Sequence, residues 1–283
     1  MNKVKLALAG LSLVLMGILT SGCMQISQEV KVNRDGTGMM VETTKFSPWV
    51  MEMIKGFIET TMDLGDKKPG QEKISPENFF PEEQFKEKAK QMGEGVEFLS
   101  REVKEFKEGM VGYVATYKIS SIDKFILNPR EEEQMTKKPG TGTPITFHFR
   151  KGKRSSYLTI KQHFKKDEKK KEEKMEKESP EKEEITPADE EKLAQLIGMF
   201  KGMRIQIVIE CGKEIETTSA DWWDKNRIIL LDFDVEQFLS RPDKLQTLSR
   251  MEKPKTKEDF KKLLQGIEGI KFDLNEEIEV QFR

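Results

Sequence analysis

VKVNRDGTGMMVETTKF, residues 30–46, is the stretch of the chain that most directly indicates the fold. Val30 and Val32 alternate with charged residues, which is the period of two expected of a β-strand. Residues 35–38, Asp-Gly-Thr-Gly, supply turn residues, and the strand pattern resumes after them. The stretch therefore predicts a β-hairpin, whose two strands pair antiparallel.

The same alternation recurs along the chain and predicts further strands. Three more hairpins are expected, each with a short Gly- or Lys-containing connection between its strand-like runs. The predicted strands are residues 96–106 with 110–119, 145–149 with 157–160, 203–209 returning as 215–218, then 227–231, and finally 270–282.

Helices are predicted between these hairpins. Ser47 and Pro48 form a helix start, with Ser as N-cap and Pro at the first helical position, and apolar residues then recur at helical spacing as far as Met62. Further helices are predicted over residues 82–92, 233–239 and 257–264. We therefore expect an α+β fold, in which one antiparallel, hairpin-rich sheet carries helices packed on one face.

Composition divides the chain into four parts. Residues 1–22 are predicted to be a lipoprotein signal peptide, and residues 23–164 an N-terminal α+β part. Residues 165–188 consist mainly of Lys and Glu, a composition that cannot bury a core, so we expect a charged flexible insertion. Residues 189–283 are predicted to complete the same domain.

The N-terminus has the layout of a secretory signal. Lys3 and Lys5 precede an apolar run over residues 6–19, and the small residues 20–22 lead directly into Cys23. This arrangement is similar to the lipobox of bacterial lipoproteins, which are cut before the cysteine and acylated on it, with palmitate as an expected acyl chain. The resemblance implies that Cys23 is the lipidation site and holds the protein on a membrane.

Two alternatives to lipidation concern the same segment. A transmembrane helix needs about 20 apolar residues, more than residues 6–19 provide. Secretion without lipid stays open, because Thr20 stands where such boxes usually have Leu, and Leu19 lies one position further back. We expect the chain on the extracytoplasmic side of the cell membrane. Since Met24 rather than Asp follows the anchor, we expect the outer membrane in an organism that has one.

Charge and reactive residues exclude several classes of function. The chain has 49 basic and 50 acidic residues, so no basic excess indicates a nucleic-acid partner. With Cys23 assigned to lipid, Cys211 has no intramolecular partner and is expected to be a structural thiol. His148 and His163 lack the spacing of metal ligands, and no nucleotide-binding or nucleophile motif is present. We expect no catalytic residues, no metal and no cofactor.

Aromatic and methionine residues are the candidates for ligand contact. Trp49, Met53 and Phe57 lie on the predicted helix, and Met-rich surfaces adapt to ligand shape. Trp222 and Trp223 follow Asp221 in a predicted loop. Both groups are also explained by packing in a core, and a sugar-stacking platform at the tryptophans is the alternative.

Three segments together resemble a known group of proteins. They are the lipobox with the strand and Asp-Gly-Thr-Gly turn that follow it, the stretch GKEIETTSADWWDKNRIILLDFD (residues 212–234), and the closing stretch GIEGIKFDLNEEIEVQF (residues 266–282). This order is similar to bacterial envelope lipoproteins related to the LppM-like domain, although Ser219 stands where their motif has Asn. The resemblance implies an α+β envelope domain and supplies no catalytic residue, and lipid binding is proposed for some relatives.

The sequence leaves several functions open. We expect a membrane-tethered lipoprotein that is not an enzyme and acts as a binding or scaffold module of the cell envelope, with the membrane and other envelope proteins as partners. One alternative is a binder of a lipid or other amphiphile in a pocket between the sheet and the helix over residues 47–63. A second alternative is a carbohydrate-active envelope enzyme.

Overall fold

The strand that begins at Met24 lies in the middle of the larger sheet. The computed structural model describes residues 24–62, 79–128, 144–164, 202–240 and 257–283, and in it β1 (Met24–Val32) is paired along both edges. β2 (Gly38–Phe46) pairs with it antiparallel, with Met24 opposite Phe46. β8 (Arg204–Cys211) pairs with it in parallel along the other edge.

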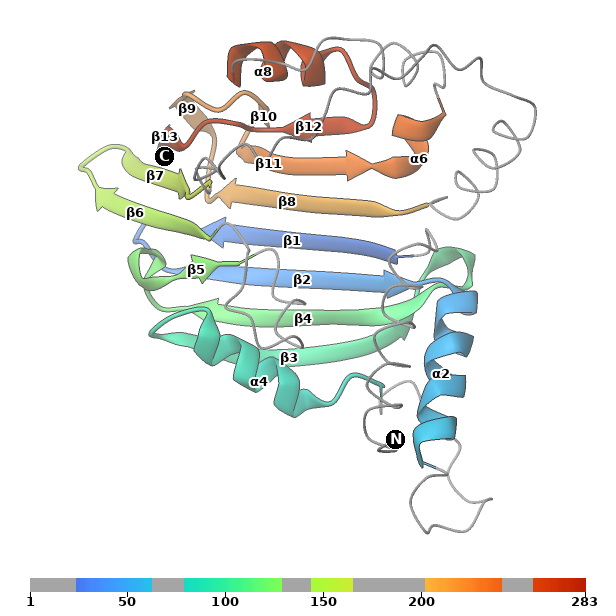
Figure 1. The fold of residues 1–283 in the computed structure, drawn as a ribbon. Helices are drawn as coiled ribbons and strands as arrows, with labels where there is room; N and C mark the ends of the chain where they lie inside the picture. Colours follow the sequence, from blue (N-terminus) through green and yellow to red (C-terminus); the bar gives the residue numbers. More distant parts are fainter. Residues whose placement is uncertain (1–23, 63–78, 129–143, 165–201, 241–256) are drawn as a thin grey trace, which may run out of the picture.

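The larger sheet, which we call sheet A, has eight strands. Their order is β10-β11-β8-β1-β2-β4-β3, and β12 also pairs with β11 (Figure 1). Among the described strands, β1 and β8 form the one parallel pair, and the other pairs of sheet A are antiparallel. The strands not yet bounded are β3 (Val96–Glu105), β4 (Val111–Ile119), β10 (Trp223–Asp224), β11 (Arg227–Asp234) and β12 (Ile270–Phe272).

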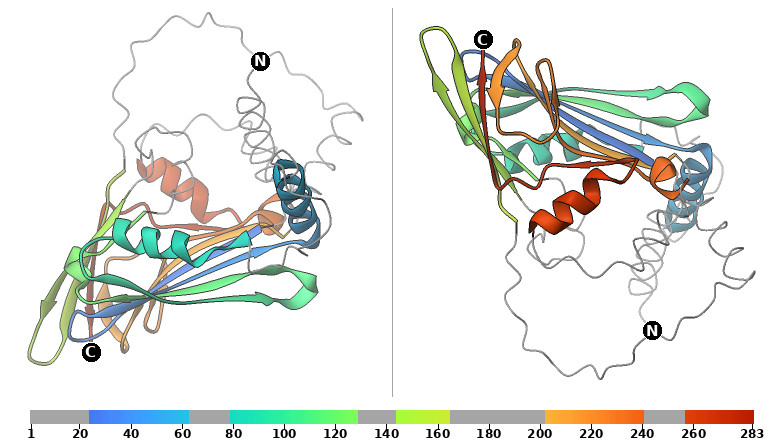
Figure 2. Two further views of the ribbon diagram at one scale, coloured as in Figure 1. Left: turned by 90° about the horizontal axis from the view of Figure 1, so that it is seen from below. Right: turned by 90° about the horizontal axis from the view of Figure 1, so that it is seen from above.

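The smaller sheet, sheet B, has five strands in the order β5-β6-β7-β13-β9 and lies across the end of sheet A at which β1 ends (Figure 2). The turn after β1 connects the sheets: Arg34 donates from Nη2 to the carbonyl oxygen of Arg154 at 2.6 Å, and Ser156 Oγ donates to the carbonyl oxygen of Arg34 at 3.1 Å. The strands of sheet B are β5 (Ile126–Leu127), β6 (Ile145–Lys151), β7 (Ser156–Gln162), β9 (Ile215–Thr218) and β13 (Glu277–Phe282).

Two helices cover one face of sheet A. α4 packs on β3, burying Phe85 and Ala89, and α8 lies against β12 on the same face (Figure 2). α2 follows β2 and projects beyond the end of the sheet (Figure 1). None of the helices in the described ranges is both long and apolar enough to span a bilayer. The helical elements are α2 (Pro48–Met62), α4 (Glu82–Gln91), α6 (Val235–Leu239), α8 (Lys257–Gln265), and the 3₁₀ turns η1 (Lys107–Gly109) and η2 (Ile122–Lys124).

The structure confirms the α+β class and the mostly antiparallel pairing. The hairpin predicted from residues 30–46 is present as β1 and β2, with Gly36 at a positive φ of 86° in its turn. The predicted helix cap is also present, since Ser47 Oγ accepts the backbone N–H of Val50 at 3.4 Å. The predicted signal peptide with Cys23 and the charged insertion lie outside the described residues.

Four predictions about the sheet were wrong. The strands form two sheets instead of one, and sheet A is mixed, since β8 runs parallel to β1. β9 does not return along β8, because both edges of β8 are occupied, by β1 and β11; β9 pairs with β13 in sheet B. The closing strand over residues 270–282 is divided into β12 and β13, at the point where the buried Asp273 carboxylate accepts the backbone N–H of Asn275.

A buried ion pair lies between α4 and sheet A. Glu42 on β2 is 2% exposed, and its Oε2 lies 2.7 Å from Lys88 Nζ of α4. Tyr113 of β4 donates its hydroxyl to Glu42 Oε1 at 2.7 Å. Burial, and then the adjacent Glu42 carboxylate, raise the pKa of Tyr113 well above its usual value. The ion pair at Oε2 and the hydrogen bond at Oε1 offset part of the cost of burying the Glu42 carboxylate.

Replacement of Lys88 by Met should therefore destabilise the protein. The variant leaves the Glu42 carboxylate buried without its cation, which costs about 3 kcal/mol of unfolding free energy for pairs of this kind. Lys90→Met is the matched control, because Lys90 pairs with Glu87 in solvent, where an ion pair contributes less than about 1 kcal/mol. Urea unfolding of both variants measures the difference, and equal stabilities would contradict the assignment.

Candidate functional site

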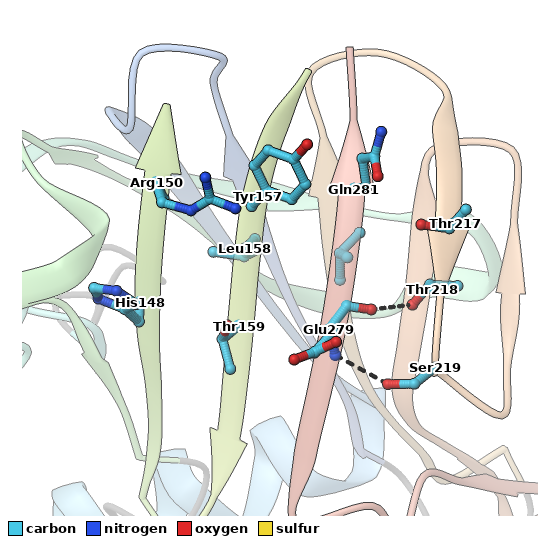
Figure 3. Close-up of a pocket in the computed structure, with 11 residues that line it drawn as sticks. His148, Arg150, Tyr157, Leu158, Thr159, Thr217, Thr218, Ser219, Glu279 and Gln281 are labelled. Carbon is cyan, nitrogen blue, oxygen red and sulfur yellow. Dashed lines mark hydrogen bonds between the residues drawn. The ribbon is translucent and has the colours of Figure 1, made fainter. Parts of the chain in front are cut away.

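The outward face of sheet B is hollowed and polar. A hollow of about 630 Å³ crosses four neighbouring strands, and Figure 3 shows its side chains standing in two rows. Arg150, Tyr157, Gln281 and Thr217 form one row across the strands, and His148, Thr159, Glu279 and Ser219 form the other. We call these eight residues the sheet B groove.

Strand alternation explains why these side chains face outward. On β7, Leu158 and Ile160 are buried in the core, so Tyr157 and Thr159 point to the opposite face. On β13, Val280 and Phe282 are buried, which places Glu279 and Gln281 on the groove side. The register of the strands then aligns polar positions from distant parts of the chain.

Several groove side chains are held in place by neighbours. The Arg150 guanidinium lies 4.1 Å from the centre of the Tyr157 ring, a cation–π arrangement. His148 Nδ1 lies 3.1 Å from Asp123 Oδ1. Ser219 Oγ accepts the backbone N–H of Glu279 at 2.9 Å, which ties β9 to β13 (Figure 3).

A carboxylate near one end of the groove is strongly hydrogen-bonded. Glu216 accepts from Ser155 Oγ at 2.7 Å and from Gln281 Nε2 at 2.6 Å, and it also pairs with Arg283. The hydrogen bond from Ser155, followed by those from Arg283 and Gln281, lowers the pKa of Glu216. The groove itself combines a guanidinium, a carboxylate, hydroxyls and an amide, and it can hydrogen-bond a polar ligand.

A second hollow, of about 530 Å³, lies between two turns. It is lined by Arg34 and Asp35 of the turn after β1, by Lys151 at the end of β6, and by Lys153 of the turn that follows. Arg34 crosses between the turns, since its Nη2 donates to carbonyl oxygens of the second turn. Both hollows thus adjoin β6 and β7 at the end of sheet A where β1 ends.

Of the five residues predicted for ligand contact, the four with described side chains lie at opposite ends of sheet A. Trp49 is 51% exposed and Met53 half-buried, both on α2, while the side chain of Phe57 lies outside the described residues. Trp222 is half-buried and Trp223 47% exposed, at the opposite end of sheet A. Neither hollow is lined by any of the four side chains that the structure describes, those of Trp49, Met53, Trp222 and Trp223.

Asp221, which precedes these tryptophans, makes contacts that hold three segments together, and we call them the Asp221 joint. Its carboxylate pairs with Lys261 of α8, and its backbone N–H donates to Asp273 Oδ2 at 2.7 Å. Asp273 is fully buried, and this burial raises the pKa of its carboxyl group. The joint connects the chain before β10 to the junction of β12 and β13.

The sequence analysis did not predict the sheet B groove. Alternation predicts that His148 on β6 and Thr159 on β7 are polar strand positions, but a single sequence does not show that β13 and β9 lie beside them. His163 is a separate position, with its Nε2 2.8 Å from Thr146 Oγ1. In the part of the chain that the structure describes, no cluster of three or more His, Cys, Asp or Glu side chains is arranged to hold a metal ion.

Comparison with known proteins gives little further information. No protein-family model and no curated protein sequence matches the chain. The solved folded domain of the LppM protein of Mycobacterium tuberculosis matches over 93% of this chain and 91% of that domain, with 7% sequence identity and a TM-score of 0.30. This is a weak structural likeness, and no residue role follows from it.

Cys211 should be unreactive in the folded protein. It is 0% exposed at the end of β8, and burial raises the pKa of its thiol to about 12, so very little reactive thiolate forms near neutral pH. In a Cys23→Ser variant, where Cys211 is the remaining thiol, a disulfide reagent should react only after unfolding in guanidinium chloride. Rapid reaction of the folded Cys23→Ser variant would contradict the burial of Cys211. The double variant Cys23→Ser/Cys211→Ser has no thiol and gives the background signal of the reagent.

Proposed function

We propose that the chain is a lipid-anchored, non-enzymatic binding module of the bacterial cell envelope. Lipid on Cys23 holds it on the extracytoplasmic side of the membrane, or on the outer membrane of an organism that has two membranes. The sheet B groove is its binding surface.

The observation that carries this proposal is that Cys23 directly precedes a strand of sheet A. Strand β1 starts at Met24, the residue that directly follows Cys23. Adjacent Cα atoms are about 3.8 Å apart, so no spacer separates an acylated Cys23 from the sheet. Each buried methylene of an acyl chain contributes about 0.8 kcal/mol, and two or more chains give durable attachment.

The groove lies at the end of the domain remote from this anchor. β1 rises about 3.3 Å per residue, so its nine residues separate Met24 from Val32 by about 26 Å. Sheet B adjoins the Val32 end through Arg34 and Ser156. The groove is therefore directed away from the membrane surface and toward the material outside it.

The chemistry of the groove favours a ligand rich in hydroxyl and amide groups. Arg150 and Gln281 offer donors, Glu279 offers acceptors, and the threonine and serine hydroxyls offer both. Cell-wall glycan has this composition and lies outside the membrane of a bacterium, so we propose it as the ligand class. The two hollows do not supply the pocket that the amphiphile-binding alternative requires against α2, and that alternative stays a prediction.

Acylation of Cys23 is tested by feeding cells an alkyne-bearing fatty acid. The wild-type chain should take up the label, and mass spectrometry should place it on an N-terminal Cys23 after removal of residues 1–22. Cys23→Ser should take up none, whereas Cys211→Ser should label like the wild type. A wild-type chain cut at the same point without acyl groups would overturn the anchor.

Binding by the groove is tested by sedimentation with insoluble cell-wall glycan. The wild-type protein in detergent should cosediment, and Arg150→Ala combined with Glu279→Ala should lose most of the bound fraction. Lys118→Ala combined with Lys31→Ala is the control, because these lysines are exposed on sheet A and do not line the groove. Equal sedimentation of both double variants would contradict the assignment of the groove.

A further inference from the structure

Three segments meet at the end of sheet A where β1 begins. Met24 lies opposite Phe46 at the end of β2, and Phe46 lies opposite Val111 at the start of β4. The turn between β3 and β4 also approaches the start of α2, since a Cβ on Gly109 would lie 3.6 Å from Pro48 Cγ. We call Met24, residues 46–49 and residues 106–110 the anchor edge.

Trp49 is the exposed aromatic residue of this edge. The next two residues of α2, Val50 and Met51, are buried, while Trp49 has 51% of its surface exposed. An indole side chain with this exposure leaves a large apolar area in contact with water. Trp residues are enriched at membrane–water interfaces, where the ring is covered and its N–H remains hydrated.

Phe106 is a further aromatic residue of the edge. Its ring is half-buried, and the ammonium groups of Lys45 and Lys104 lie 5.1 and 5.5 Å from its centre. Lysine side chains lie along an apolar surface in this way when their charged ends can reach water or lipid headgroups. Phe106, Lys45 and Lys104 therefore have the arrangement of side chains that lie at a membrane–water interface.

Charge at the edge is close to balanced. Lys45, Lys104 and Lys107 are matched in number by the exposed carboxylates Glu102, Glu105 and Glu108, and Lys104 Nζ lies 3.3 Å from Glu102 Oε2. Attraction to anionic lipid is therefore a small contribution, and burial of the aromatic rings supplies most of the free energy of contact. Contact of this kind does not require anionic headgroups.

We propose that the anchor edge rests on the bilayer that holds the acyl chains of Cys23, with Trp49 and Phe106 at the level of the lipid headgroups. This inference rests on the proposed acylation. Cys23 precedes Met24, which is itself part of the edge, so the bilayer is the surface brought into contact with these rings. The sheets then stand end-on to the membrane.

The chain contains a matched control for this geometry. Trp223 is 47% exposed, nearly the same as Trp49, but it lies level with Val30 through Ile228 and Ile209. Six residues along β1 separate Val30 from Met24, about 20 Å at the usual strand rise. An apolar surface that rests on a bilayer enters the headgroup and acyl boundary by only about 5–10 Å. This depth is less than the separation of Trp223 from the Met24 end, so Trp223 should stay outside the bilayer.

Two single-tryptophan forms of the full, acylated chain test the proposal. One keeps Trp49 and carries Trp222→Phe and Trp223→Phe; the other keeps Trp223 and carries Trp49→Phe and Trp222→Phe. Each is reconstituted into phosphatidylcholine vesicles with or without brominated acyl chains, which quench nearby indoles. Trp49 should emit at shorter wavelength than Trp223 and lose most of its fluorescence to the quencher, while Trp223 should lose little.

The outcomes separate this proposal from the proposed anchor. Acylated protein in which Trp49 is quenched no more than Trp223 would overturn the membrane contact and leave the anchor standing. Protein found by mass spectrometry to lack acyl groups would overturn both. Quenching of Trp49 that appears only with added anionic lipid would contradict the aromatic origin of the contact.

Discussion

The parallel pairing of β1 with β8 is the contact on which the rest of the structure depends. A hairpin cannot form a parallel pair, because the chain must cross over before the second strand begins. Here the paired residues Ser27 and Gln206 are 179 positions apart. This pairing places β1 inside sheet A, where β2 and β8 occupy both of its edges, and it brings the C-terminal strands alongside the N-terminal ones.

A central β1 gives the domain two distinct ends. One end begins at Met24 and carries Trp49 and Phe106; the other adjoins sheet B and its polar groove. Attachment at Cys23 would therefore act on a strand hydrogen-bonded on both sides, not on an edge strand or a loop. The buried pair of Glu42 and Lys88 holds α4 on this sheet at the same time.

Local features of the fold could be predicted from the sequence because they depend on neighbouring residues. The first hairpin follows from alternation and from the turn at residues 35–38, and the start of α2 follows from Ser47 and Pro48. The return of residues 215–218 along β8 was predicted wrongly, because a turn between two strand-like runs does not show which sheet the second one joins. The groove was missed for the same reason, since its two rows combine β6, β7, β13 and β9.

The sequence by itself therefore determined the α+β class, three of the four predicted hairpins, the helix start at Ser47, and the expectation that Cys23 carries lipid. Backbone preferences and side-chain periodicity act over a few residues, so they can be detected in one chain. Only the tertiary structure decided that β8 runs parallel to β1, that two sheets form, and that polar side chains from distant segments share one face. Those choices depend on which apolar faces are buried together, and that requires all the strands at once.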